Sequence, residues 1–498
     1  MTESLWSSTV RIAEHYPRLE QDELHVDVAV VGAGITGVTA ALLLKLAGKR
    51  VALVEAREVG SGVTSGTTAH LTEAVDTRYH VLESKFGKEG ARLIAGSSRA
   101  AIEQVAELAS RFSSDADFER LPGYLYTEHD EDVEQIQLEL EAARRAGLQV
   151  ELAHVPLPLP VKAGLRFDNQ AQFHPTAYLS GLVSRIPGDG SHVFEQMRVL
   201  SVDEGEPCRL HFGHGPTITA ERVILATHAP INRLMLQTKV AHYRSYVVSG
   251  PVEQAPYGLF WDTDDPYHYI RAQQVGYQKH LIVGGADHKT GQESDTEAPF
   301  ASLSTYAERL GLRHVEHRWS AQVIEPVDGL PFIGRNALSS HVYIATGYSG
   351  NGTSFGTLAA MILRDACLDK PNPYADLYQA TRMKPLASLA TFLEENVDFP
   401  LHLLSDRLRP PNARSLDDIA PGEGKIVRVK GQRLAVYRDD QGSLHAVSPV
   451  CTHLGCHVAF NQVEKSWDCP CHGSRFNVDG GVIEGPALHA LQKKSLAG

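Results

Sequence analysis

The order of apolar and polar residues near the start of the chain predicts an α/β unit. Residues 26–31 are mostly apolar, as in a buried strand. A glycine-rich turn follows, and apolar residues then recur at helical spacing over about 35–47. Residues 50–54 form a second run of the buried-strand type. The pattern therefore predicts a strand, a tight turn, a helix and a second strand.

Three glycines in this turn, Gly32, Gly34 and Gly37, match the spacing of a dinucleotide-binding fingerprint. In that fingerprint, glycine permits the tight turn, close approach of the backbone to a pyrophosphate, and close packing of helix on strand. The helix N-terminus then faces the phosphates. Glu55 follows the second strand 23 positions after Gly32, where an acidic residue binds ribose hydroxyls. A glycine turn in an unrelated α/β unit is the alternative, but the complete context favours dinucleotide binding.

Cysteine and histidine are concentrated near the other end of the chain, in CTHLGC at 451–456 and CPCHGS at 469–474. The pairs Cys451 with His453 and Cys469 with His472 suit a 2Fe-2S cluster, in which two thiolates hold one iron and two imidazoles hold the other. A structural zinc site uses the same ligand types and is the alternative. Neutral imidazole ligands leave less negative charge on the cluster, so it accepts an electron more readily than a four-cysteine centre.

These motifs and the sequence that follows them resemble the Rieske domain, in particular the disulfide-containing type of cytochrome bc complexes. The resemblance implies a disulfide between Cys456 and Cys471, the two motif cysteines that are not ligands. It also implies that the Gly-Pro-Ala run at 485–487 shields the cluster, and that Ser474 donates a hydrogen bond to a cluster sulfur. Phe476 stands where high-potential members carry tyrosine, so we expect a somewhat lower potential here.

Four further segments accompany the fingerprint in a fixed order: TSGTTAHLT (64–72), VILATHAP (223–230), DGLPFIG (328–334) and GYSGNGTSFG (347–356). The set resembles the flavin amine oxidoreductase family that includes D-amino-acid oxidase, glycine oxidase, sarcosine oxidase and dimethylglycine dehydrogenase. In this family the last glycine-rich turn returns to the flavin before a closing helix, here at about 357–367. The resemblance therefore implies that the dinucleotide is FAD. The implied FAD contacts beyond the fingerprint are Thr67, Thr68, His70, Val199, Gly347, Gly350 and Gly352.

His70 lies in SGTTAH, which resembles the SGTTWH-like segment in which dimethylglycine and sarcosine dehydrogenases attach FAD covalently through histidine. Ala69 replaces the tryptophan of that segment, and a hydrogen-bonding role for His70 is the alternative to attachment. The family's other covalent route uses a cysteine before the DGLPFIG-like motif. Residues 319–327 contain no cysteine, which excludes that route.

Substrate contacts are expected from the polar and aromatic segment DPYHYIRAQ at 265–273. Some relatives place an arginine in this region that binds a substrate carboxylate bidentately, so Arg271 is a candidate, with Tyr269 beside it. Tyr246, in a second polar and aromatic segment, is a third candidate. All three are also explained as ordinary strand residues of a substrate domain. Ser354 stands where sarcosine oxidases carry a carboxylate-binding lysine, so an N-methyl amino acid is not specifically indicated.

The net charge and the apolar stretches of the chain limit which partners and which cellular location are expected. The chain has 498 residues and a formal net charge of −13, without a basic run, which argues against nucleic acid. The acidic balance suits solubility, and steering of a basic electron carrier is the alternative. The first residues lack a secretory pattern, and the apolar stretch at 38–46 is too short to cross a membrane. We therefore expect a cytoplasmic protein.

Together, the two modules indicate an oxidoreductase with two redox groups. A flavin takes two electrons from a substrate as a hydride, whereas a Rieske cluster takes one electron at a time. We expect an FAD-dependent enzyme that oxidises the C–N bond of an amine or amino acid and passes electrons through the cluster to a carrier protein, a quinone or oxygen. One alternative is an NAD(P)H-linked flavin/Rieske reductase, although the sequence shows no second nucleotide fingerprint. The other is a redox-sensing flavoprotein.

The predicted fold class is α/β: a Rossmann-like FAD-binding domain interleaved with a mainly antiparallel substrate-domain sheet, followed by a small all-β Rieske domain. We expect the flavin domain at 24–368, with substrate segments at about 92–185 and 243–322. A connector at 369–412 and the Rieske domain at 413–498 would follow. The connector contains a helix-like segment at 383–397, and Pro410 and Pro411 mark its end.

Overall fold

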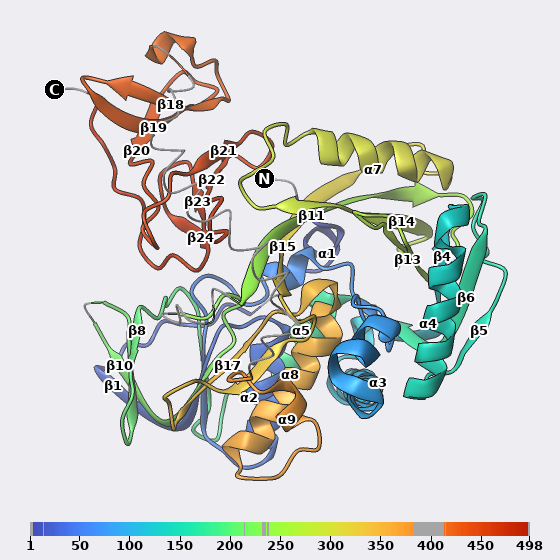
Figure 1. The fold of residues 1–498 in the computed structure, drawn as a ribbon. Helices are drawn as coiled ribbons and strands as arrows, with labels where there is room; N and C mark the ends of the chain where they lie inside the picture. Colours follow the sequence, from blue (N-terminus) through green and yellow to red (C-terminus); the bar gives the residue numbers. More distant parts are fainter. Residues whose placement is uncertain are drawn as a thin grey trace.

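The computed structural model describes residues 3–12, 14–213, 215–231, 236, 239–382, 413 and 415–496. The helix-like segment expected at 383–397 and the proline pair at 410–411 lie outside these residues. Figure 1 shows a large module, coloured from blue to orange, and a small all-β module in red that lies beside the strands β11 (Val240–Val252) and β15 (His317–Pro326). This arrangement confirms the predicted fold class.

The first sheet of the large module contains the fingerprint unit. β1 (Glu23–Val31) runs parallel to β2 (Val51–Val54) and to β10 (Thr217–Leu225), and α2 (Ile35–Leu46) connects β1 to β2. The predicted strands and helix agree with these bounds to within a few residues. Across the described sheet the order is β16 (Phe332–Arg335), β17 (Val342–Thr346), β10, β1, β2 and β7 (His192–Phe194). In addition, β9 (Cys208–His211) pairs with β10, and β8 (Ser201–Asp203) pairs with β9.

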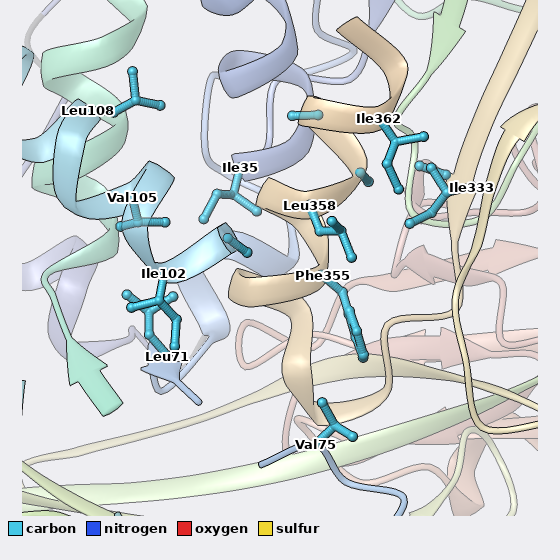
Figure 2. Close-up of a cluster of buried hydrophobic side chains, with 14 of the residues drawn as sticks. Ile35, Leu71, Val75, Ile102, Val105, Leu108, Ile333, Phe355, Leu358 and Ile362 are labelled. Atoms are coloured by element: carbon cyan, nitrogen blue, oxygen red, sulfur yellow. The ribbon is translucent and has the colours of Figure 1, made fainter. Parts of the chain in front are cut away.

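Helices α2, α3 (Tyr79–Phe112) and α8 (Gly352–Cys367) share one buried apolar core. Each fully buried aliphatic side chain in it contributes roughly 2 kcal/mol of hydrophobic free energy. The core joins the start of α8 to α2, so it brings the glycine-rich turn before α8 close to the fingerprint. Figure 2 shows part of this core, with Ile102, Val105 and Leu108 from α3, Phe355, Leu358 and Ile362 from α8, and Ile35 from α2.

The second sheet is mainly antiparallel, as predicted. Only the pair β12 (Leu259–Asp262) and β4 (Glu119–Thr127) is parallel within the described sheet. Helices α7 (Ala298–Arg309) and α4 (Val133–Ala146) pack on its strands. The described order is β15, β11, β14 (Gln278–Lys289), β13 (Tyr269–Val275), β12, β4, β6 (Ala163–Gln172) and β3 (His70–Leu71), with β5 (Val150–Leu152) beside β6.

Three shorter α-helices also lie in the described part of the large module: α1 (Leu5–Thr9), α5 (Pro175–Val183) and α9 (Ala375–Tyr378). α1 contacts α5, and α5 contacts α2. The first helix thereby closes one side of the module near its core. Within the described residues, no helix is both long and apolar enough to cross a membrane.

The small module is built from short antiparallel strands around a buried core that includes Trp467 and Phe476. The two cysteine and histidine motifs form the loops that precede β21 and β23, so both emerge on one part of this module. One sheet contains β18 (Gly424–Val429), β19 (Gln432–Arg438) and β20 (Leu444–Val447). The other contains β21 (Ala459–Asn461), β22 (Ser466–Asp468), β23 (Arg475–Asn477) and β24 (Val482–Glu484).

Candidate functional site

The fingerprint glycines lie where β1 turns into α2, and two of them leave no room for a side chain. Gly32 has φ of +99°, and a Cβ there would lie 2.4 Å from the carbonyl oxygen of Ala226. A Cβ on Gly37 would lie 1.8 Å from the carbonyl oxygen of Gly32. Glu55 closes the turn, because its Oε2 accepts a hydrogen bond from the backbone N–H of Ala33 at 2.8 Å. A bare backbone turn at a helix start fits the pyrophosphate of a dinucleotide.

A cavity runs from this turn to the substrate sheet and reaches the small module. Its lining, which combines a glycine turn with aromatic side chains of the substrate sheet, fits FAD. Gly37 and Gly347 do not line it: Gly37 packs helix on strand, and Gly347, with φ of +78°, shapes the turn after β17. The predicted cofactor residues that do line it are Gly32, Gly34, Glu55, Thr67, Thr68, His70, Val199, Gly350 and Gly352.

His70 lines the cavity with both ring nitrogens engaged. Its Nε2 lies 3.3 Å from the carbonyl oxygen of Ile270, an acceptor, so Nε2 carries the hydrogen. Nδ1 then accepts from the Thr68 hydroxyl at 3.0 Å. Burial, together with the positive charge of nearby Arg271, lowers the pKa of His70 to about 3. His70 is therefore a neutral imidazole held in one orientation.

The expectation that Arg271 grips a substrate carboxylate is wrong for this structure. Arg271 is fully buried and does not line the cavity. Its Nη1 donates to the carbonyl oxygens of Thr68, Ala69 and Phe173, at 2.9, 3.1 and 3.2 Å. Its Nη2 donates to Gln273. The guanidinium thus supports the backbone just before His70 instead of facing a ligand.

Tyr246 is corrected for the same reason. Its ring is fully buried in the core of the substrate sheet, and its hydroxyl hydrogen-bonds His288 Nε2 at 2.8 Å. It does not line the cavity. Tyr269, by contrast, lines the cavity, and its hydroxyl forms a hydrogen bond with the hydroxyl of Ser245.

Two carboxyl groups that sequence reasoning missed, Asp76 and Asp287, line the cavity beside Tyr267 and Tyr269. Burial raises the pKa of Asp76 to about 6 and that of Asp287 to about 7. No spacing rule marks either residue. The one available signal is in β14, where Asp287 is an acidic residue that comes soon after a run of buried apolar residues in the same strand.

The cluster motifs form two loops that a disulfide joins. Cys456 and Cys471 are bonded, which confirms the predicted pair. Cys451 and Cys469 are buried free thiols whose side chains lie in hydrogen-bonding contact. The rings of His453 and His472 lie with centroids 5.0 Å apart. The two joined loops therefore carry all four predicted ligands: Cys451, His453, Cys469 and His472.

The donor set in these loops fits a 2Fe-2S cluster. Nδ1 of His453 is buried, and among the described residues it has no hydrogen-bond partner. A buried imidazole nitrogen without a partner is costly unless a ligand completes it. Two thiols and two imidazoles on paired loops are the ligand types of a Rieske centre. The hydroxyl of Ser474 lies beside this set, since it accepts from the Ala487 N–H at 3.0 Å and contacts Cys451.

Buried charges attach the small module to the large one. Arg244 on β11 is almost completely buried, and its Nη2 donates to Glu464 Oε1 at 2.7 Å, while Nη1 lies 3.2 Å from Glu484 Oε2. Arg475 contacts the same two carboxylates at 2.9 and 3.4 Å. Burial alone would raise the pKa of Glu464, but the two arginines outweigh it and hold that pKa at about 2. The arginines also lower the pKa of Glu484, so both glutamates are ionised at neutral pH.

The cavity and the cluster loops meet at this contact. Residues 483–488, which include the proline loop, line the cavity together with the fingerprint. Gln322, another lining residue, donates from Nε2 to the carbonyl oxygen of Gly473 at 2.7 Å. Gly473 directly follows the predicted ligand His472. One side chain thus spans from the cavity wall to a cluster loop.

Comparisons with known proteins agree with this architecture. The family model of FAD dependent oxidoreductases matches residues 27–366, and the model of the Rieske [2Fe-2S] domain matches residues 412–495. The Rieske 2Fe-2S iron-sulfur protein YhfW of Bacillus subtilis is 33% identical over 500 residues, which cover 99% of this chain and 98% of that protein. It therefore matches both modules.

Two further comparisons concern the large module. Gamma-glutamylputrescine oxidoreductase of Escherichia coli is 23% identical over 386 residues, which cover 73% of this chain and 89% of that enzyme. The crystal structure of glycine oxidase from Geobacillus kaustophilus superposes with a TM-score of 0.63 at 19% identity, over 72% of this chain and 99% of that one. The second likeness establishes the fold of the large module. The chain belongs to the FAD dependent oxidoreductase family and carries, after its flavin domain, a Rieske domain that binds a 2Fe-2S cluster.

Proposed function

We propose that this enzyme oxidises the C–N bond of an amine or amino acid and passes the electrons singly, through its Rieske cluster, to an external acceptor. The carrying observation is the shared cavity: fingerprint residues and the proline loop of the Rieske domain line one continuous space. When bound, FAD supplies hydride acceptance and the cluster supplies single-electron transfer. The two groups would then lie on either side of one module contact.

The residues around the cavity have distinct parts in this proposal. Gly32, Gly34 and Glu55 would hold the dinucleotide end of FAD, with Val199 on the same part of the wall. Thr67, Thr68, His70, Gly350 and Gly352 would surround the remainder. The engaged ring nitrogens of His70 favour a hydrogen-bonding role over covalent attachment. Of the predicted catalytic residues, Tyr269 would lie beside the substrate, because its side chain lines the cavity whereas Arg271 and Tyr246 do not.

On the Rieske side, Cys451, His453, Cys469 and His472 would hold the cluster, and the disulfide would keep their loops together. Gln322 links the cavity wall to the loop of His472 through a hydrogen bond, which is a short connection for an electron. Relatives support the substrate class, because the E. coli relative is named for an amine and the structural neighbour for an amino acid. The acceptor would be a carrier protein, a quinone or oxygen.

The domain limits belong to the same proposal. We place the flavin domain at 24–368, with substrate segments at about 92–185 and 243–322, the connector at 369–412 and the Rieske domain at 413–498. The end of α8 at Cys367 and the isolated bridge between Ala413 and Val427 support the two inner limits.

An anaerobic reduction experiment tests the function. The purified protein, carrying both groups, is mixed with a panel of aliphatic amines and amino acids while flavin absorbance is followed. Bleaching by one of these compounds, followed by a reduced-cluster EPR signal, is the expected result. Reduction of both centres by NADH, with no response to any amine or amino acid, would replace this proposal with an NAD(P)H-linked reductase.

A further inference from the structure

We propose that Asp76 and Asp287 form a cation-binding pair that selects the substrate by its ammonium group, so that the substrate is an amine without an α-carboxylate. This inference rests on the proposed amine or amino-acid oxidation and narrows its substrate class. Both carboxyl groups line the cavity, on the part that the substrate sheet forms. The pair comes from distant segments, the stretch after β3 and the end of β14.

Asp287 is available to a ligand because the protein satisfies only part of its carboxyl group. The carboxyl group of Asp287 accepts one hydrogen bond, from the side chain of Ser245. Its Oδ1 is buried from solvent and, among the described residues, has no hydrogen-bond partner. A buried carboxylate oxygen left in this state costs free energy unless a ligand supplies a donor. An ammonium group supplies donors and the opposite charge together.

Asp76 is fixed next to the turn that precedes α8. It accepts hydrogen bonds from the backbone N–H of Gly350 and from the hydroxyl of Tyr267. The packing there is tight, because a Cβ on Gly350 would lie 2.5 Å from that hydroxyl oxygen and 2.8 Å from Asp76 Oδ2. Asp76 and Asp287 also repel each other, because the negative charge of Asp76 helps to raise the pKa of Asp287. A bound cation relieves this repulsion.

Aromatic rings complete the surroundings of a cation. Tyr267 and Tyr269 lie with ring centroids 5.6 Å apart, and both line the cavity, as do Trp261 and Tyr348. The faces of such rings attract an ammonium group, most strongly where water is excluded. Carboxylates and rings in one space are thus complementary to a substituted ammonium.

The same part of the cavity offers little for a carboxylate. Arg271, the expected carboxylate-binding residue, lies outside the lining. Arg78 does line the cavity, but its Nη2 donates to the backbone carbonyl of Asp262 at 3.0 Å. Arg57 and Arg198 line the other end, near Glu55. The two carboxylates outnumber the one nearby arginine, so the charge balance favours a cation.

The pair also accepts the proton that an ammonium must lose before its carbon is oxidised. In that step an N–H bond of the substrate breaks and an O–H bond forms on Asp287, without transfer of electrons. The groups facing the pair are Ser245 on β11, Tyr269 on β13, Tyr267, His268 and Asp265 before it, and Arg78 beside Asp76. Burial raises the pKa of both carboxyl groups, to about 6 for Asp76 and about 7 for Asp287. Cation binding therefore strengthens as pH rises through 6 to 7, because the carboxylates are then ionised.

The test combines binding with reduction, on the protein carrying both redox groups. Calorimetry with tert-butylammonium, which supplies N–H donors but has no C–H on the carbon bonded to nitrogen and so is not oxidised, measures cation binding alone. Flavin bleaching is then followed with n-butylamine, 1,4-diaminobutane, glycine and L-alanine. We expect the two amines to bleach the flavin, and Asp287→Asn to lower kcat/KM for them about 30-fold or more. Asp287→Asn and Asp76→Asn should each abolish the calorimetric signal of tert-butylammonium.

Asp130→Asn is the matched control, since Asp130 is an exposed partner of Lys162 away from the cavity lining, and it should change neither measurement. Bleaching by the amino acids alone, with both Asn variants unaffected and Arg78→Met impaired, would overturn the cation pair while leaving C–N oxidation intact. Bleaching by NADH alone would overturn the proposed function itself.

Discussion

Arg271 shows how a residue of the expected type serves a different purpose. Its guanidinium donates to the carbonyl oxygens of Thr68, Ala69 and Phe173 inside the protein. We expect Arg271→Met to lower the free energy of unfolding by about 3 kcal/mol, because these buried carbonyls lose charged donors. Denaturant unfolding of the purified protein measures the change.

Arg318→Met is the control, because Arg318 pairs with Glu297 at the exposed surface, where an ion pair contributes little. Unchanged stability of Arg271→Met, together with a raised KM for carboxylate-bearing substrates, would return Arg271 to a substrate role.

Phe476 tests how the protein sets the potential of its cluster. The ring is fully buried in the same core as Cys451 and Cys469 and has no hydroxyl to donate. We expect Phe476→Tyr to raise the midpoint potential on the order of tens of millivolts, since hydrogen bonds to cluster sulfur or thiolate favour the reduced state. A redox titration followed by EPR measures it, with Phe460→Tyr, in a neighbouring position of the module, as control. Equal potentials in the wild type and Phe476→Tyr would show that no such bond forms.

The contact between β11 and the Rieske strands is the element that unites the two modules. Arg244→Met removes the shared partner of Glu464 and Glu484, and breaking a buried ion pair costs about 3–5 kcal/mol. We expect the flavin to bleach at the wild-type rate while the cluster signal appears at least tenfold more slowly. Rapid mixing with freeze-quench EPR separates the two rates.

Arg309→Met provides the comparison, because its ion pair with Glu128 lies within the large module. If cluster reduction in Arg244→Met kept the wild-type rate, the ionic contact would have no part in electron transfer.

Elements and motifs differ in how far the sequence predicts them. Gly32, Gly34 and the predicted cluster ligands can be named from the sequence because each motif is local, and its chemistry depends on close spacing. The Arg244–Glu464 pair was not, because its members are 220 positions apart and meet only when the modules pack. Asp76 and Asp287 were not predicted for the same reason: they are far apart in the sequence and come to one cavity only in the folded protein. Arg271 was misassigned because the sequence does not show which side of a buried strand faces the cavity.

At the scale of the whole molecule, the Rieske domain lies beside β11 and β15 of the large module (Figure 1). Its residues 483–488 form part of the wall of the flavin cavity. A domain that only reported the redox state of its surroundings would not need to share that wall. The shared cavity, the ionised contact and the Gln322 hydrogen bond instead support direct passage of electrons between the two centres. The arrangement predicts that the cluster is the exit for substrate electrons.

The most direct measurement compares the wild type with Cys469→Ser, which removes a cluster ligand. Both proteins are reduced anaerobically by the amine that bleaches the wild-type flavin, and turnover with a one-electron acceptor is then recorded. We predict equal flavin bleaching in both, a cluster EPR signal in the wild type alone, and loss of at least nine-tenths of turnover in Cys469→Ser, since a cluster-free protein lacks the single-electron step. Undiminished turnover by Cys469→Ser would contradict the relay.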